Sequence, residues 1–279
     1  MNTRLSYTRE HHWHSLWRRK LRPITGVCSC MLIGAILMRG NAMGASLIWD
    51  SNAAGIPNPL NGNGVWQTAN SWWNPITPAI TSWSNATPDD ATFGTGSTGT
   101  TAYGVSLGSA TTVGTLNFAN HNYTINNLSA VPLTIHNGIT AATASGTVNT
   151  PVVLGAANTW NVGATRTLFM GGAVSGGFGV TKTGSGTARF NSAAANIYTG
   201  PTTVSAGTLV LDFANLATAT NLIDPSSVLV LGNGTLSVIG KTTGATSQTF
   251  AATTINGGSA VTVNSSGGGG TTLNLGAIT

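Results

Sequence analysis

The sequence predicts an all-β protein, a right-handed parallel β-helix or solenoid that begins with a tryptophan-rich β cap. Short runs of alternating apolar and polar residues recur from Tyr103 to the end of the chain, as expected of half-buried strands. Gly, Asn, Ser and Thr fill the gaps, and no helical apolar period free of glycine is present there. Similar Thr-Leu strand starts also return at irregular intervals, beginning at Thr115, Thr167, Thr208, Thr235 and Thr272. Short strands joined by turns are also typical of a sandwich, but this recurrence favours a solenoid, with about ten coils stacked ~4.8 Å apart.

Residues 1–45 have the three parts of an export signal peptide. A basic stretch extends to Arg22, an apolar run covers residues 24–38, and small residues follow around Gly44 and Ala45. The alternative is an uncleaved membrane anchor, but the run is shorter than the ~20 apolar residues that a span needs. Both cysteines, Cys28 and Cys30, lie in this run, so the mature chain has no thiol. This excludes disulfides, cysteine catalysis and cysteine-bound metal.

The charge distribution argues against a nucleic-acid partner. The formal net charge is +5, but most of the basic residues precede residue 40. From residue 45 onward the charged side chains are Arg166, Lys182, Arg189 and Lys241 against Asp50, Asp89, Asp90, Asp212 and Asp224. The body is therefore nearly uncharged and has no basic surface for a phosphate backbone. We expect contact with a membrane only through the export signal or a C-terminal anchor that this sequence lacks.

Residues 46–100 form a tryptophan-rich module, which we interpret as an N-terminal cap. Bulky indoles and rigid proline turns are suited to covering the unpaired edge and apolar end of a strand stack. The alternative is a ligand-stacking platform for sugars, formed by Trp66, Trp72, Trp73 and Trp83. Under the cap interpretation these indoles are buried, whereas a platform needs exposed ring faces.

Residues 101–279 form the repeat region, with the clearest pattern at residues 178–211 (FGVTKTGSGTARFNSAAANIYTGPTTVSAGTLVL). Val180 and Lys182 share one face with Thr181 on the other, and Ala188 and Phe190 alternate with Arg189. Glycines separate the runs, where sharp corners favour a residue without a side chain.

This segment resembles the autotransporter-associated, or passenger-associated, β-strand repeat. The matching residues are Thr181, Lys182, Gly184, Gly186, Thr187, Asn196, Tyr198, Thr199, Gly200, Thr202, Thr203, Val204, Ala206, Gly207, Thr208 and Leu209. Ala188 and Phe190 stand where leucines are usual, and Pro201 replaces a glycine. The resemblance implies a passenger-type protein that is secreted or held at the cell surface or outer membrane of a Gram-negative-type bacterium, with a role in transport, display or adhesion.

Convergent catalytic or metal-binding groups are scarce. Asp89 and Asp90 are adjacent and point to opposite faces of a strand, so we expect them to hydrogen-bond a turn or an indole. Asp212 and Asp224 lack neighbouring acids or bases in the sequence. We interpret His121 and His136 as solvated corner residues that are too few to hold a metal, even stacked in successive coils.

The remaining polar signals also favour structural roles. Lys182 is expected to have a structural role at the surface, as its place in the repeat suggests. Ser185 lies in no nucleophile elbow, and the four glycines at 267–270 predict a flexible loop.

The sequence therefore predicts a non-enzymatic, adhesin-like structural protein without a cofactor, with surface polysaccharide or host-cell glycans as candidate partners. The alternative is an extracellular carbohydrate-binding or carbohydrate-active β-helix protein that uses the tryptophan-rich module. Because the sequence stops directly after the strand-like TTLNL, we expect a continuation beyond Thr279 or a truncated gene product.

Overall fold

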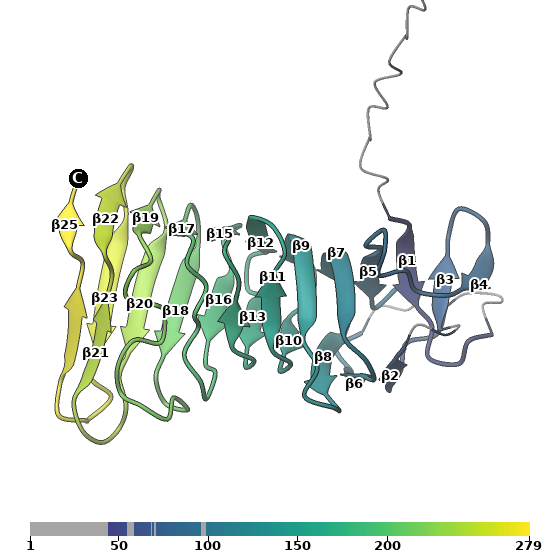
Figure 1. Ribbon diagram of the computed structural model, residues 1–279, viewed down its shortest axis with the longest axis horizontal. Helices are drawn as coiled ribbons and strands as arrows, with labels where there is room; N and C mark the ends of the chain where they lie inside the picture. Colours follow the sequence, from purple (N-terminus) through teal and green to yellow (C-terminus); the bar gives the residue numbers. More distant parts are fainter. Residues whose placement is uncertain (1–43, 55–58, 68, 70, 96–98) are drawn as a thin grey trace, which may run out of the picture. The chain divides into compact units, whose positions relative to one another are not determined.

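The computed structural model describes residues 44–54, 59–67, 69, 71–95 and 99–279, and in these residues it has strands and turns but no helix. The strands stack into a parallel β-solenoid (Figure 1), which confirms the predicted fold class. Most of the predicted export signal, residues 1–43, lies outside the described residues.

Two long sheets and one short sheet contain all of the described strands. The fourteen-stranded sheet contains β1 (Ser46–Trp49), β3 (Trp72–Asn74), β4 (Ala79–Thr81), β5 (Asp90–Phe93), β7 (Thr111–Phe118), β9 (Leu133–Ala141), β11 (Val152–Leu154), β12 (Asn158–Val162), β14 (Val174–Ser175), β15 (Val180–Thr183), β17 (Thr202–Val204), β19 (Leu229–Leu231), β22 (Ala252–Ile255) and β25 (Ala277–Ile278). The nine-stranded sheet contains β2 (Gly64–Trp66), β6 (Ala102–Leu107), β8 (Asn122–Asn127), β10 (Gly146–Val148), β13 (Thr167–Met170), β16 (Thr187–Phe190), β18 (Thr208–Asp212), β20 (Thr235–Ile239) and β23 (Ala260–Asn264). The short sheet pairs β21 (Thr246–Thr249) with β24 (Thr271–Asn274).

The nine-stranded sheet shows how the chain winds. Each turn adds one strand beside the strand of the previous turn, in parallel and in register, from β2 to β23. The sheet therefore has nine rungs, close to the ten or so coils expected. Thr167, Thr208 and Thr235 occupy one column of this sheet, so their Thr-Leu dipeptides mark a true structural repeat. Thr115 and Thr272 lie in the other two sheets, which explains why the spacing was irregular.

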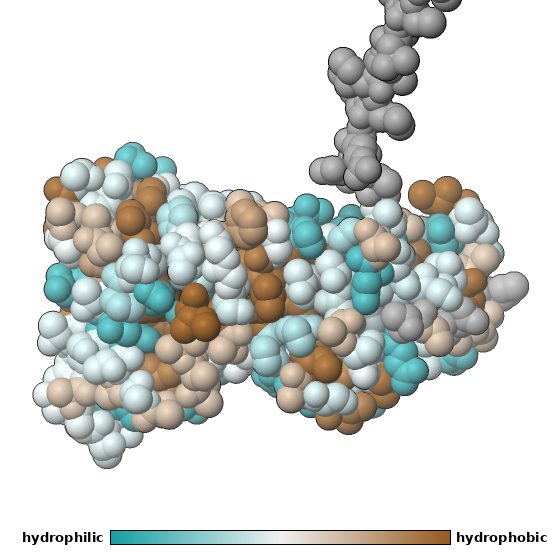
Figure 2. Space-filling view, in the orientation of Figure 1, coloured by the Kyte–Doolittle hydropathy of each residue, from teal (hydrophilic) through white to brown (hydrophobic). Residues whose placement is uncertain are grey.

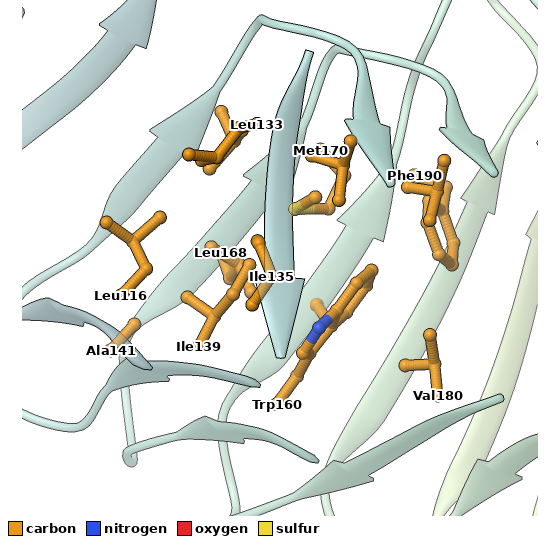
Figure 3. Close-up of a cluster of buried hydrophobic side chains, with 14 of the residues drawn as sticks. Leu116, Leu133, Ile135, Ile139, Ala141, Trp160, Leu168, Met170, Val180 and Phe190 are labelled. Carbon is orange, nitrogen blue, oxygen red and sulfur yellow. The ribbon is translucent and has the colours of Figure 1, made fainter. Parts of the chain in front are cut away.

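The core consists of apolar columns between the sheets. In parallel, in-register strands each side chain lies above the equivalent side chain of the previous turn, and every second one points inward. One column contains Met170, Phe190, Leu211 and Val238, all fully buried. Figure 3 shows Met170 and Phe190 with Trp160, whose ring centroid lies 5.3 Å from that of Phe190. Burial of each large apolar side chain contributes about 1.5–3 kcal/mol, so these columns are the main source of stability.

Buried amides also connect the turns inside this core. The side chain of Asn196 accepts a hydrogen bond from the Val174 amide (2.8 Å) and donates one to the Leu222 carbonyl (2.9 Å), so it links three turns. Gln248 likewise exchanges two hydrogen bonds with the main chain of Ile223. Both side chains satisfy main-chain groups of neighbouring turns and are themselves satisfied, so their burial is favourable.

Gly138 is required by a close approach between turns. It lies within β9, which pairs first with β11 and then with β12, and its φ of 147° is in the region that favours glycine. A Cβ atom at this position would lie 1.9 Å from the Thr159 carbonyl oxygen. Any side chain at residue 138 would therefore push β9 away from β12.

Candidate functional site

Three of the four tryptophans predicted to stack on ligands form a buried cluster at the N-terminal end of the described stack. Trp66 ends β2, Trp72 begins β3, and Trp83 follows β4. Their ring centroids lie 4.7–5.0 Å apart, and Trp66 and Trp72 are completely buried while Trp83 is 4% exposed. Because the rings cover one another, none of these three offers an open face to a sugar.

Trp73 differs from its three neighbours. It lies on the opposite face of β3 from Trp72 and is partly exposed, between Ile48 of β1 and Ile80 of β4. The ligand-stacking prediction therefore applies to Trp73 alone. The strands around it, β1 with β3 and β3 with β4, are the only antiparallel pairs among the described strands.

Asp89 and Asp90 accept hydrogen bonds from main-chain amides. Asp89 accepts hydrogen bonds from the amides of Ala45 (2.7 Å) and Ser84 (2.8 Å), and Asp90 accepts one from the amide of Thr115. The expected bonding to a turn is confirmed for Asp89, whereas Asp90 binds within β7 of the next turn. The indole of Trp83 donates to Asn85 and to a main-chain carbonyl and not to either aspartate.

Asp50, Asp212 and Asp224 also have hydrogen-bond partners within the protein. Asp50 is fully buried and accepts from the Leu60 amide at 3.1 Å. Asp212 is paired with Arg189 of the preceding turn, with 3.0 Å between Oδ2 and Nε. Hydrogen bonds from the hydroxyl and amide of Ser226 lower the pKa of Asp224 below its usual value. All five aspartates of the body thus have structural partners.

The histidines are placed differently from the expectation. His121 is only 5% exposed, adopts a φ of 58° at the corner before β8, and packs its ring edge-on against Tyr103 at 5.3 Å. The prediction of a solvated residue is wrong for His121, because the corner folds inward against the neighbouring turn. His136 is partly exposed in β9 of the fourteen-stranded sheet, whereas His121 precedes β8 of the nine-stranded sheet, so the two histidines do not share a column. In the described part of the chain, no group of three or more His, Cys, Asp or Glu side chains is placed to hold a metal.

Lys182 corrects a second expectation, because it is completely buried and not at the surface. Its side chain points inward with Val180, in a column between Trp160 and Val204. Nζ donates to the carbonyls of Thr183 (2.7 Å), Gly184 (2.7 Å) and, in the next turn, Ala206 (3.2 Å). Burial lowers the pKa of Lys182 to about 8. The ammonium thus fastens two successive corners together, a role that the charge of the residue did not indicate.

The outer surface contains few charges. Figure 2 shows one face covered mainly by residues of intermediate hydropathy, with scattered apolar side chains. No helix in the described residues is long and apolar enough to cross a membrane.

Comparisons with known proteins agree with this architecture. The passenger-associated-transport-repeat model matches residues 180–211, which contain β15 and β17 of one sheet and β16 and all but the last residue of β18 of the other. The repeat thus corresponds to two successive rungs in each sheet.

A curated relative extends the similarity along the chain. The "Adhesin BmaC autotransporter" of Brucella suis biovar 1 (strain 1330) is 30% identical over 194 residues, which is 68% of this chain. The aligned part is 5% of the relative's own length. No solved structure matches the chain. The two-rung repeat and this similarity together place the chain among the autotransporter-associated β-strand repeat proteins.

Proposed function

We propose that this chain is a non-enzymatic part of an autotransporter passenger, an adhesin-like β-solenoid that is secreted or displayed on the surface of a Gram-negative-type bacterium. The observation that supports this most strongly is the passenger repeat at residues 180–211, built here as two in-register rungs. The relative named as an autotransporter adhesin supports the same role.

The side-chain chemistry supports a structural role over catalysis. A hydrolase or lyase needs an acid or base that is free to exchange a proton with a substrate. In this body Asp50, Asp89 and Asp90 accept main-chain hydrogen bonds, and Asp212 is held by Arg189. If these carboxylates left their partners to act on a substrate, the turns that they hold would lose hydrogen bonds.

The surface supports a role in display. Threonine, serine and asparagine side chains replace charges along the solenoid, and parallel ladders satisfy its main-chain groups. Such a surface offers many hydroxyl and amide groups to glycans, so we propose surface polysaccharide or host-cell glycans as partners.

Surface display is tested with an epitope tag inserted at Gly258 of the full protein in its own bacterium. Gly258 is exposed, and no atom lies within 4 Å of a Cβ placed there, so an insertion leaves the core intact. We expect an antibody to label intact cells, and external protease to remove the tag while a cytoplasmic control protein survives. Labelling only after permeabilisation would refute display.

Adhesion is tested separately with a strain that lacks the gene. We expect this strain to attach less to host cells or to polysaccharide-coated surfaces, and the tagged gene to restore attachment. Unchanged attachment in a strain whose parent displays the tag would refute the adhesin-like role and leave display standing.

A further inference from the structure

A polar hollow lies on the flank of the solenoid where four successive turns meet. Its volume is about 290 Å³, at the lower end of small-molecule sites. It is lined by corner residues that directly precede, or begin, the strands β6, β8, β10 and β13 of the nine-stranded sheet. The lining residues are Gly99, Thr100, Asn120, His121, Asn122, Thr143, Ala144 and Arg166.

Arg166 supplies the only charge of this lining. The other cations of the body have protein partners: Lys182 binds carbonyls, Arg189 binds Asp212, and Lys241 donates to the Leu216 carbonyl at 2.5 Å. In contrast, the guanidinium of Arg166 makes no hydrogen bond or ion pair with any described residue. The hollow therefore holds a positive charge that the described part of the chain does not neutralise.

Hydroxyl and amide groups surround this charge. Asn122 donates through Nδ2 to the Thr100 carbonyl at 3.3 Å, which leaves its Oδ1 atom as an acceptor. The Thr143 hydroxyl donates to the Ala119 carbonyl and keeps its lone pairs for another donor. A ligand here meets both donors and acceptors, which suits a polyhydroxylated molecule better than a simple inorganic anion.

Small residues keep the hollow open. A Cβ atom at Gly99 would lie 2.4 Å from Cε1 of His121, so only glycine lets the chain pass over this buried ring. Ala144, two turns after Gly99, is a second small residue in the lining. The lining therefore combines a nearly buried imidazole and a methyl group with the polar groups of Thr100, Asn122 and Thr143.

We propose that this hollow binds one carboxylated sugar unit, such as a uronic acid residue of an acidic polysaccharide. A guanidinium binds a carboxylate through two parallel hydrogen bonds, and a single cation matches the single charge of a uronate. Thr100, Asn122 and Thr143 supply partners for the sugar hydroxyls. This inference deepens the proposed function, because it names a glycan class and a site for it.

The test uses the purified full-length protein and isothermal titration calorimetry with a trisaccharide of galacturonic acid. The same trisaccharide as its methyl ester is the matched neutral probe. We expect the acidic form to bind and the ester to bind at least tenfold more weakly, because the charge-assisted pair with Arg166 is lost. Higher salt should weaken binding of the acidic form only.

Three variants locate the site. Arg166→Gln should reduce affinity for the acidic trisaccharide at least tenfold and leave the thermal unfolding temperature unchanged, since Arg166 has no side-chain partner to lose. Lys241→Gln removes one charge away from the hollow and should leave affinity unchanged. Thr100→Ala should weaken trisaccharide binding by a smaller factor.

Equal binding of acid and ester, native affinity in Arg166→Gln, equal losses in Arg166→Gln and Lys241→Gln, or no binding of the acid by the native protein would each overturn the proposal. Because this test uses purified protein, a negative result leaves surface display intact. Conversely, failure of the display experiment would not alter a measured affinity.

Discussion

Raising the pH above about 8 should stabilise this protein, because of the buried Lys182 ammonium. Burial lowers the pKa of Lys182 from 10.5 to about 8. In the unfolded chain the side chain stays protonated up to about pH 10.4. Between these values the unfolded state binds more protons than the folded state, so the free energy of unfolding rises with pH.

The size of this effect follows from the pKa difference. Where the unfolded state binds one more proton than the folded state, the free energy of unfolding rises by about 1.4 kcal/mol for each pH unit. We therefore expect Lys182 to raise the free energy of unfolding by about 2 kcal/mol between pH 8 and pH 10. Above about pH 10 the trend should reverse, because tyrosines ionise in the unfolded chain. Burial raises the pKa of Tyr123 to about 12 and that of Tyr198 further, so both resist ionisation in the folded state.

Guanidinium chloride unfolding, followed by circular dichroism at a series of pH values, measures this gain. Lys182→Met keeps the apolar stem in the column between Trp160 and Val204 but cannot titrate, so its stability should not rise over the same pH range. Lys241→Met is the matched control and should keep the native slope. A native slope in Lys182→Met, or a native stability that does not rise between pH 8 and pH 10, would refute the reasoning.

Three further predictions concern packing, and thermal unfolding by circular dichroism measures each of them. Phe190→Ala leaves a cavity in a fully buried column and should cost about 3–5 kcal/mol, whereas Phe190→Leu should cost less; equal costs would contradict a tightly packed column. Gly138→Ala should destabilise the protein clearly, because the new methyl group meets the Thr159 carbonyl, and an unchanged unfolding temperature would show that β9 does not approach β12 this closely. Trp72→Ala should lower the unfolding temperature strongly and Trp73→Ala only slightly; in a polysaccharide pull-down, loss of binding in Trp73→Ala would support ligand stacking, and retention would count against it.

The strands of the best repeat were predictable, because a period of two is a local property of the sequence. The runs around Val180, Ala188 and Leu209 lie in β15, β16 and β18 as expected. Their inward residues are buried, including Lys182, which the alternation itself placed beside Val180. The error over Lys182 came from giving its charge more weight than its position. The alternation was the better guide, because three carbonyls in the folded chain satisfy the ammonium.

The polar hollow was not predictable from sequence spacing. Thr100, Asn122, Thr143 and Arg166 follow one another at intervals of about twenty residues, but nothing in the sequence shows that all four lie at corners on one flank. Arg166 also has no neighbour in the sequence that suggests a site. The small residues Gly99 and Ala144, which stand next to polar residues, were the one partial indication of a hollow in the sequence.

The sequence by itself determined the class of fold, the strand content and the family, since alternation, glycine corners and repeat motifs are all read within a few residues of each other. Only the tertiary structure decided which turns touch. Arg189 meets Asp212 across 23 residues, and Lys182 meets the Ala206 carbonyl across 24. The physical reason is the register between parallel strands, which depends on how many residues each corner holds, so a partner one turn away is fixed by winding and not by local pattern.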